Sequence, residues 1–183
     1  MSLIEAKSHL RVTHSDEDAR IAALATAVRE AFEAQTRRQL VETTWTLTLD
    51  RFPPSDRAAI LVPRPPLRSV ESIRYIDTAG VEQTWPEGEY TVQAPAGPKP
   101  PRGRIHPQHE ETYPDTADVS GAVTIEFEAG YAGGAVPEAV KAVLLAALSS
   151  LYVHREDQIT GTIVSDNRTV RRLFDAWTLP VYA

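Results

Sequence analysis

Three glycines precede the most apolar helical segment of the chain, and glycines ahead of a helix can bind phosphate. Gly130, Gly133 and Gly134 lie in FEAGYAGGAVPEAVK, residues 127–141. A Walker phosphate loop reads GxxxxGK[ST], with the lysine directly after the last glycine. Here Ala-Val-Pro-Glu follows, and Glu138 would repel a phosphate in the first helical turn. We therefore expect a turn from a strand into a helix, and no cofactor.

The segment HPQHEE, residues 106–111, contains the other concentrated set of potential ligands. Catalytic zinc takes three protein ligands held on rigid structure, whereas this segment lies among prolines and lacks the HExxH order. The chain contains no cysteine and no GxSxG nucleophile motif. We expect no catalytic residue and no metal site. An enzyme or a small metal-binding protein remains the alternative, and it would use His106, His109, Glu110 and Glu111.

A basic and aromatic cluster lies near the C-terminus. Arginine and aromatic side chains are enriched at interface cores, which favours a docking segment. The same pattern also fits an amphipathic helix with a solvated basic face. The candidate docking residues are Arg168, Arg171, Arg172, Phe174 and Trp177.

Composition and charge exclude several classes of protein. The 183 residues are 42% hydrophobic and 24% charged, which is typical of one globular domain. A formal net charge of −6 argues against general attraction to nucleic acid. The longest aliphatic run, residues 142–148, is far shorter than the ~20 residues that span a bilayer. The first 12 residues lack the apolar core of a signal peptide, so we expect no membrane association.

Proline placement divides the chain into helical ends and a β-rich middle. Of the 14 prolines, 12 lie within residues 53–114, and proline breaks helix interiors. We therefore predict an α+β fold in a single domain. Its helical part comprises residues 1–42 and 135–183, and its β-rich part comprises residues 43–134.

Four helices are predicted at the two ends. Ser2 and Glu5 have the spacing of a capping box. A second helix begins at Ser15, where three acidic residues favour the helix dipole, and fades near residues 38–40. A third follows Pro137, and a short last one covers residues 170–177. The third helix carries a wide apolar stripe that must pack against other helices or a neighbouring subunit. The stripe includes Val140, Val143, Leu144, Leu148 and Leu151.

The middle of the chain alternates in the manner of half-buried strands. TWTLTLDRF and residues 123–127 show this period of two. SVESIRYID and VEQTW flank a turn at Thr78-Ala79-Gly80, which predicts a hairpin. AAILVP and EYTV are further short strands. Residues 94–120 are rich in proline, glycine and polar groups, which predicts an extended loop.

The order of these segments resembles the head–tail connector (adaptor) proteins of tailed bacteriophages and phage-like gene transfer agents. Family members often have TGR near the end of the second helix, where this chain has TRRQL, so that helix end is expected to differ. The matching stretches are EAKSHLRV, SDEDARIAALATAVREAFEAQTRRQL, TWTLTLDRFP, ILVPRPPLRSVESIRYIDTAG and VTIEFEAGYAGGAVPEAVKAVLLAALSSLYVHRED.

The resemblance implies a virion structural protein without a cofactor. Its fold is a helical bundle of connector type, with the β-rich portion inserted between the second and third helices. Members form a homo-oligomeric, dodecameric ring beneath the portal protein, at the head–tail junction of a particle assembled in the bacterial host cytoplasm. The ring extends the channel for DNA packaging and ejection, without sequence-specific DNA binding, and carries the downstream tail-completion or stopper protein.

Two hypotheses accompany this resemblance. An acidic lumen would repel DNA phosphates and let the genome slide. The basic and aromatic segment would reach the portal, so deleting residues 166–183 is expected to abolish portal binding and leave the fold intact. A generic oligomeric binding module outside any particle is the remaining alternative.

Overall fold

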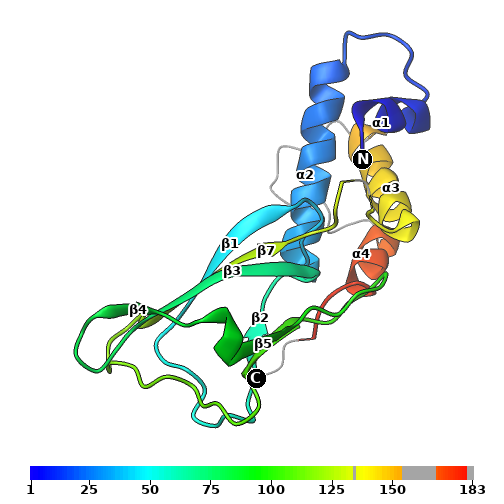
Figure 1. Ribbon diagram of the computed structural model, residues 1–183. Coiled ribbons are helices and arrows are strands. Elements are labelled where there is room, and N and C mark those ends of the chain that lie inside the picture. The colour runs from blue at the N-terminus through cyan, green and yellow to red at the C-terminus, as the bar shows by residue number, and fades with distance from the viewer. Residues whose placement is uncertain (134, 154–167, 181–183) are drawn as a thin grey trace. The chain divides into compact units, whose positions relative to one another are not determined.

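The computed structural model describes residues 1–133, 135–153 and 168–180. Within them, two helices come first, seven strands and a short 3-10 helix follow, and two helices end the chain (Figure 1). The chain forms two compact units: a helical unit from Met1–Leu40 and Ala135–Ala183, and a β unit from Val41–Gly134. The mixed class predicted from the sequence, helices with antiparallel sheets, is confirmed.

The helical unit packs around α2. Its helices are α1 (Leu3–Leu10), α2 (Asp18–Thr36), α3 (Glu138–Val153) and α4 (Arg168–Asp175). α2 contacts each of the other three, and α3 contacts α1 and α4. The apolar stripes of the helices therefore meet in one core. Its buried residues include Ala6, Ile21, Val28, Phe32, Val140, Val143, Leu144, Ala147, Leu148, Leu151, Val170 and Phe174.

The two N-terminal helix starts differ in how they are capped. The predicted capping box is confirmed: Glu5 N donates to Ser2 Oγ at 3.2 Å, and Ser2 N donates to Glu5 Oε2 at 2.6 Å. These bonds lower the pKa of Glu5. The second helix begins at Asp18, later than predicted, and its preceding residue makes no side-chain cap bond. Its acidic residues form ion pairs instead, including Lys7 Nζ to Asp18 Oδ1 at 2.5 Å.

α2 ends in a left-handed residue. Arg37 has φ 59° and ψ 29°, a conformation that favours glycine because a Cβ is strained there. Arg37 occupies the middle of Thr36-Arg37-Arg38, where family members often have the glycine of TGR. The helix thus stops as a glycine-capped helix would, although the glycine is missing.

The β unit contains two antiparallel sheets. The first has four strands in the order β1-β7-β3-β4, and the second has three in the order β2-β6-β5. A short 3-10 helix, η1 (Glu87–Glu89), precedes β5. The strands are β1 (Thr43–Leu49), β2 (Ile60–Val62), β3 (Leu67–Ile76), β4 (Glu82–Thr84), β5 (Tyr90–Gln93), β6 (Gly103–Pro107) and β7 (Val123–Ala129).

Aromatic rings fill much of the core of this unit. Phe52 stacks on Tyr113 with centroids 5.3 Å apart and meets Trp85 edge-on at 5.2 Å. The Tyr113 hydroxyl donates to Ala58 O at 2.8 Å, and burial raises the pKa of Tyr113 to about 12. The aliphatic part of the core comes from both sheets and includes Ile60, Val62, Leu67, Ile73, Ile105, Val123, Ile125 and Ala129.

The predicted hairpin is confirmed between β3 and β4, which pair from Arg74–Thr84 to Ile76–Glu82. Asp77 organises its turn by accepting from Ala79 N at 2.9 Å and Val81 N at 3.0 Å. The bond from Val81, together with one from Gln83, lowers the pKa of Asp77.

One prediction in this unit is wrong: residues 94–120 are not all loop. β6 lies within them and pairs with both β2 and β5, so it is the middle strand of the second sheet. Its polar residues Arg104 and His106 alternate with Gly103 and Ile105, so only one large apolar side chain marks the strand. Gly103 is needed because a Cβ there would lie 2.2 Å from Leu67 Cδ2.

The glycines before α3 have different roles. Gly130 has φ 119°, and a Cβ there would lie 2.5 Å from the carbonyl oxygen of Val41. Gly133 has open space where its Cβ would be. The backbone therefore requires glycine at Gly130 and tolerates a side chain at Gly133. Gly134 lies outside the described residues.

We expect Gly130→Ala to destabilise the protein by roughly 2–4 kcal/mol, because it adds a clash with backbone to a strained φ. Gly133→Ala is the matched control and should change the free energy of unfolding by less than about 0.5 kcal/mol. Thermal and urea unfolding followed by tryptophan fluorescence would measure both. Equal effects of the two variants would contradict this account.

We expect Arg37→Gly to stabilise the protein by roughly 0.5–1 kcal/mol, because glycine adopts the left-handed conformation without strain. Arg37→Ala removes the same charged side chain but keeps the Cβ, so it should leave stability nearly unchanged. Urea denaturation of the helical unit, followed by circular dichroism at a helix wavelength, would separate the two. A gain shared by both variants would assign the effect to charge instead.

Candidate functional site

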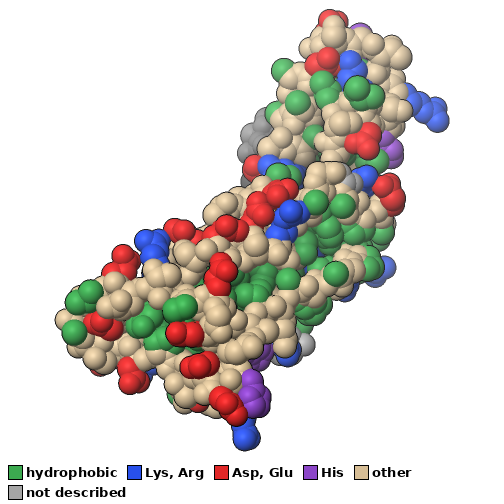
Figure 2. Space-filling model, viewed as in Figure 1, with side chains coloured by type: hydrophobic (Ala, Val, Ile, Leu, Met, Phe, Trp, Pro, Cys, Tyr) green, Lys and Arg blue, Asp and Glu red, His purple; other side chains and the backbone are tan. Residues whose placement is uncertain are grey.

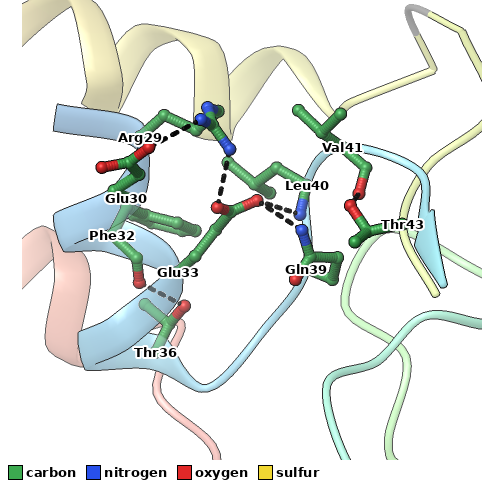
Figure 3. Close-up of polar contacts among 9 residues, drawn as sticks. All are labelled: Arg29, Glu30, Phe32, Glu33, Thr36, Gln39, Leu40, Val41 and Thr43. Carbon is green, nitrogen blue, oxygen red and sulfur yellow. Dashed lines mark hydrogen bonds and ion pairs between the residues drawn. The ribbon is translucent and has the colours of Figure 1, made fainter. Parts of the chain in front are cut away.

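A buried carboxylate organises the end of α2 (Figure 3). The side chain of Glu33 is buried and accepts several hydrogen bonds. Its donors include Arg29 NH1 at 3.0 Å, Gln39 Nε2 at 3.2 Å and the backbone N–H of Leu40 at 2.8 Å. One carboxylate therefore binds both α2 and the segment that follows it, and so fixes the direction in which the chain continues after the helix.

Further hydrogen bonds attach the C-terminal segment to the same end of α2. The buried Arg38 donates its Nε to Trp177 O at 2.7 Å. Leu179 N donates to Thr36 O at 3.1 Å, and Gln35 Nε2 donates to Asp175 Oδ1 at 2.9 Å. α4 and the segment after it, as far as Leu179, are thus held by side-chain and backbone hydrogen bonds in addition to apolar packing.

α4 presents an apolar face inward and a basic face to solvent. Val170 and Phe174 are buried, and the Phe174 ring meets Phe32 edge-on with centroids 5.0 Å apart. The three predicted docking arginines, Arg168, Arg171 and Arg172, are all exposed, and Trp177 is half-buried. Four of the five candidate docking residues therefore reach the surface, and Phe174 belongs to the core.

This burial contradicts the expectation that deleting residues 166–183 leaves the fold intact. The deletion would remove Val170, Phe174 and Leu179, which are 3%, 0% and 6% exposed. It would also remove the carbonyl that accepts from Arg38. Because truncation would damage the core, a docking role for α4 has to be tested by surface substitutions.

The apolar stripe of α3 is used within the subunit. All five predicted packing residues are buried: Val140, Val143, Leu144, Leu148 and Leu151. In the described part of the helical unit, the exposed large apolar side chains are Ile4, Val153 and Leu173. A contact between neighbouring subunits would therefore need surfaces other than this stripe.

The outer face of the four-stranded sheet is polar and acidic (Figure 2). Arg68 lies between Glu42 and Glu128, with nitrogen–oxygen distances of 3.3 and 3.2 Å. Arg74 lies between Glu82 and Glu126, at 3.8 and 2.9 Å. Each arginine is thus shared by two carboxylates, and these six side chains carry an excess of negative charge. We call them the acidic sheet face.

The described residues contain no cluster suited to a metal ion. They contain no group of three or more His, Asp or Glu side chains that could hold a metal ion. His106 lies in β6, while His109 and Glu110 are exposed beyond it. A shallow pocket of about 140 Å³ is lined by Met1, Glu5, Glu138, Lys141, Ala142 and Leu145. Its Lys141 donates to Glu138 at 2.8 Å, which raises the pKa of Lys141.

Sequence reasoning did not identify the polar cluster around Glu33. Nothing in the spacing of EAFEAQTRRQL, residues 30–40, marks one glutamate as buried, because Glu30 and Glu33 look equivalent in a helix. The available signal was the TRRQL departure from TGR, since its Arg38 and Gln39 both turn inward.

In the described part of the chain, no helix is both long and apolar enough to cross a membrane.

Comparison with known families finds a match in the first 84 residues of the chain. Residues 1–84 match the family of phage gp6-like head–tail connector proteins. The N-terminal part of this chain carries the head–tail connector signature. The resemblance seen in the sequence is thereby confirmed over these residues. No curated protein matches the sequence.

Solved structures extend the similarity to the whole fold. A chain in the virion of a native gene transfer agent (GTA) particle is 22% identical, with a TM-score of 0.75 over 100% of this chain and 92% of that one. A chain in the neck of an empty GTA particle, with C6 symmetry, is 23% identical, with a TM-score of 0.74 over the same shares. A chain in the neck of a native GTA particle, with C12 symmetry, is 22% identical, with a TM-score of 0.71 over 99% and 90%.

We expect Glu33→Gln to destabilise the helical unit by roughly 2–4 kcal/mol, because it leaves buried donors without a charged acceptor. The matched control is Glu30→Gln, since Glu30 also contacts Arg29, at 3.1 Å, but is exposed. Glu30→Gln should lower the free energy of unfolding by less than about 0.5 kcal/mol. Chemical denaturation would measure both, and similar losses would show that burial of Glu33 is unimportant.

Proposed function

We propose that this protein is a subunit of the head–tail connector in a bacteriophage or gene transfer agent particle. The observation that carries the proposal is the fold, which matches chains of GTA necks along the full length of this sequence. The connector family match over residues 1–84 supports it independently. The family description names phage and the similar structures come from GTA particles, so either source fits.

The role is structural and not enzymatic. The family description and the similar particle structures both concern components of a virion or neck. The buried Glu33 carboxylate is consistent with this role, because it binds an arginine, a glutamine and a backbone N–H of its own chain. The protein acts at the head–tail junction, and it needs no cofactor.

We propose that copies of the chain form a dodecameric ring beneath the portal. A closed ring requires two unlike patches on each subunit, because each copy contacts its neighbours head to tail. The C12 symmetry of one similar neck supports twelve copies. The ring extends the DNA channel and presents a platform to the downstream tail-completion or stopper protein.

The exposed face of α4 is the proposed contact with the portal. Arg168, Arg171 and Arg172 point away from the core, while Val170 and Phe174 hold the helix in place. A rigid helix that displays three guanidinium groups suits an acidic partner surface, because charge complementarity steers and orients association. Trp177, half-buried beside this face, adds an aromatic anchor of the kind enriched at interfaces.

The acidic sheet face is the proposed wall of the DNA channel. Its four carboxylates outnumber its two guanidinium groups, so it would repel phosphate and allow DNA to slide. In an assembled ring, Asp and Glu should therefore outnumber Lys and Arg among the side chains that face the lumen.

The proposal is tested by counting copies in particles. DNA-containing particles isolated from the native source on a density gradient should contain about one copy of this chain per portal copy, by quantitative mass spectrometry. Arg171→Glu combined with Arg172→Glu should lower that ratio at least tenfold, because both charges lie on the proposed portal contact.

The matched control reverses two exposed arginines of the β unit, Arg57→Glu and Arg104→Glu, and should keep the wild-type ratio. Absence of the wild-type chain from particles would reject the connector function. Presence at the portal ratio with no effect of the α4 substitutions would reject the docking role of α4 and leave the connector function standing.

A further inference from the structure

β1 is an edge strand that lacks the usual protection of an edge. In the described part of the chain it pairs with β7 alone, over all seven of its residues. Its sequence, TTWTLTL, contains no proline and no charged residue. Proteins usually guard such an edge with charges, proline, bulges or short strands, because it can pair with another chain. The absence of these devices from β1 indicates an edge that is used.

Hydrogen bonds on the far side of β7 show how its backbone alternates. Ala122 O accepts from Ile76 N at 2.8 Å, and Gly130 N donates to Pro66 O at 2.9 Å. Ala122 and Gly130 therefore face β3, as do the residues at even positions between them. In an antiparallel ladder each residue directs its N–H and C=O to the same side, and neighbours alternate. The odd-numbered residues of β7 accordingly bond to β1.

The register then assigns the two sides of β1. Trp45 is opposite Phe127, and Leu47 is opposite Ile125, so the odd-numbered residues of β1 bond to β7. Thr44, Thr46 and Thr48 direct their N–H and C=O groups to the free edge. A strand laid along this edge would find roughly six backbone groups ready to form hydrogen bonds.

The apolar side chains beside this edge are incompletely covered. Trp45, Leu47 and Leu49 pack on the core but are only half-buried. Their partners across the ladder, Phe127, Ile125 and Val123, are 1%, 0% and 0% exposed. The core is therefore complete on the β7 side and only partly covered on the β1 side, where the Arg64 guanidinium lies over the Trp45 ring at 3.9 Å. An added strand would cover this row as well as pair the backbone.

The same sheet is open at its opposite edge. β4 pairs with only Arg74, Tyr75 and Ile76 of the ten-residue β3. A sheet with two unlike open edges can join identical copies head to tail, since each copy offers one edge and receives the other. A single foreign partner would need only one of them. The uncharged threonine row also offers no charge for a charged partner to recognise.

We propose that the free edge of β1 pairs with a strand of a second copy of this chain, so that the sheet continues between neighbouring subunits. The inference rests on the proposed ring, and it names the surface that makes the ring contact. The pairing would supply one of the two unlike patches, a role that the buried stripe of α3 does not fill.

Photochemical cross-linking in assembled particles tests which polypeptide lies along the free edge of β1. Thr46→p-benzoylphenylalanine places a reactive group on the exposed face beside the edge, within reach of a paired strand about 5 Å away. Illumination of particles should yield a covalent species containing two copies of this chain, identified by mass spectrometry. A product with another polypeptide, or none in particles that hold the chain at the portal ratio, would overturn the proposal.

A proline and alanine pair tests whether the contact is a backbone ladder. Thr46→Pro removes an outward N–H and leaves the bonds to β7, whereas Thr46→Ala removes the same side chain and keeps the N–H. We expect at least a tenfold loss of incorporation into particles for proline and wild-type incorporation for alanine. Equal incorporation of the two would overturn strand pairing.

A second variant guards against a folding defect in Thr46→Pro. Thr44→Lys with Thr48→Lys keeps every backbone group but places two like charges along the edge, as guarded edges do. It should fold with a wild-type unfolding temperature and also fail to incorporate. Normal incorporation of this variant would overturn the proposal. Absence of even the wild-type chain from particles would instead reject the connector function itself.

Discussion

The helical unit depends on one buried carboxylate. Glu33 neutralises Arg29 and accepts from Gln39 and from the backbone of Leu40, so the chain leaving α2 has a single favourable path. A buried charge is tolerated only when its hydrogen-bonding capacity is met, which makes this arrangement specific. Arg38 follows on the same exit segment and binds Trp177 O. The position of α4, and with it the exposed arginine face, follows from how α2 ends.

Backbone alternation has a comparable role in the β unit. Residues of β1 face β7 or the outer edge in turn. The apolar residues therefore bond to β7, while the N–H and C=O groups of three threonines find no partner strand among the described residues. The side chains alternate between faces as well, so the outer face of the sheet is polar and gathers the arginine–glutamate groups. The two-residue alternation of the strands therefore accounts for the buried core face, the acidic outer face and the open edge of the sheet.

These surfaces assign separate tasks to a small chain in the proposed ring. The basic face of α4 suits an acidic partner, the acidic sheet face suits a conduit for DNA, and the open edge of β1 suits a neighbouring copy. A net charge of −6 agrees with the proposed channel, through which DNA would pass without being bound. Buried side chains in both units connect these surfaces to packed cores.

Local patterns were enough to predict much of this structure. The capping box, the apolar stripe of α3, the threonine–apolar alternation of β1 and the turn before β4 each depend on residues close in sequence, so the sequence by itself determined them. Its motif order also determined the family resemblance. β6 was missed because its identity as a middle strand comes from two partners distant in sequence.

Only the tertiary structure decided which equivalent-looking residues are special. Glu33 and Glu30 cannot be distinguished by residue type, nor can Gly130 and Gly133, and Phe174 and Trp177 are both large aromatic residues near the C-terminus. What separates them is burial, the approach of the Val41 carbonyl, and a ring contact with Phe32, respectively. The free edge of β1 likewise exists only once the strand order is known. Spacing along the chain carries information about neighbours in sequence, whereas burial and pairing depend on neighbours in space.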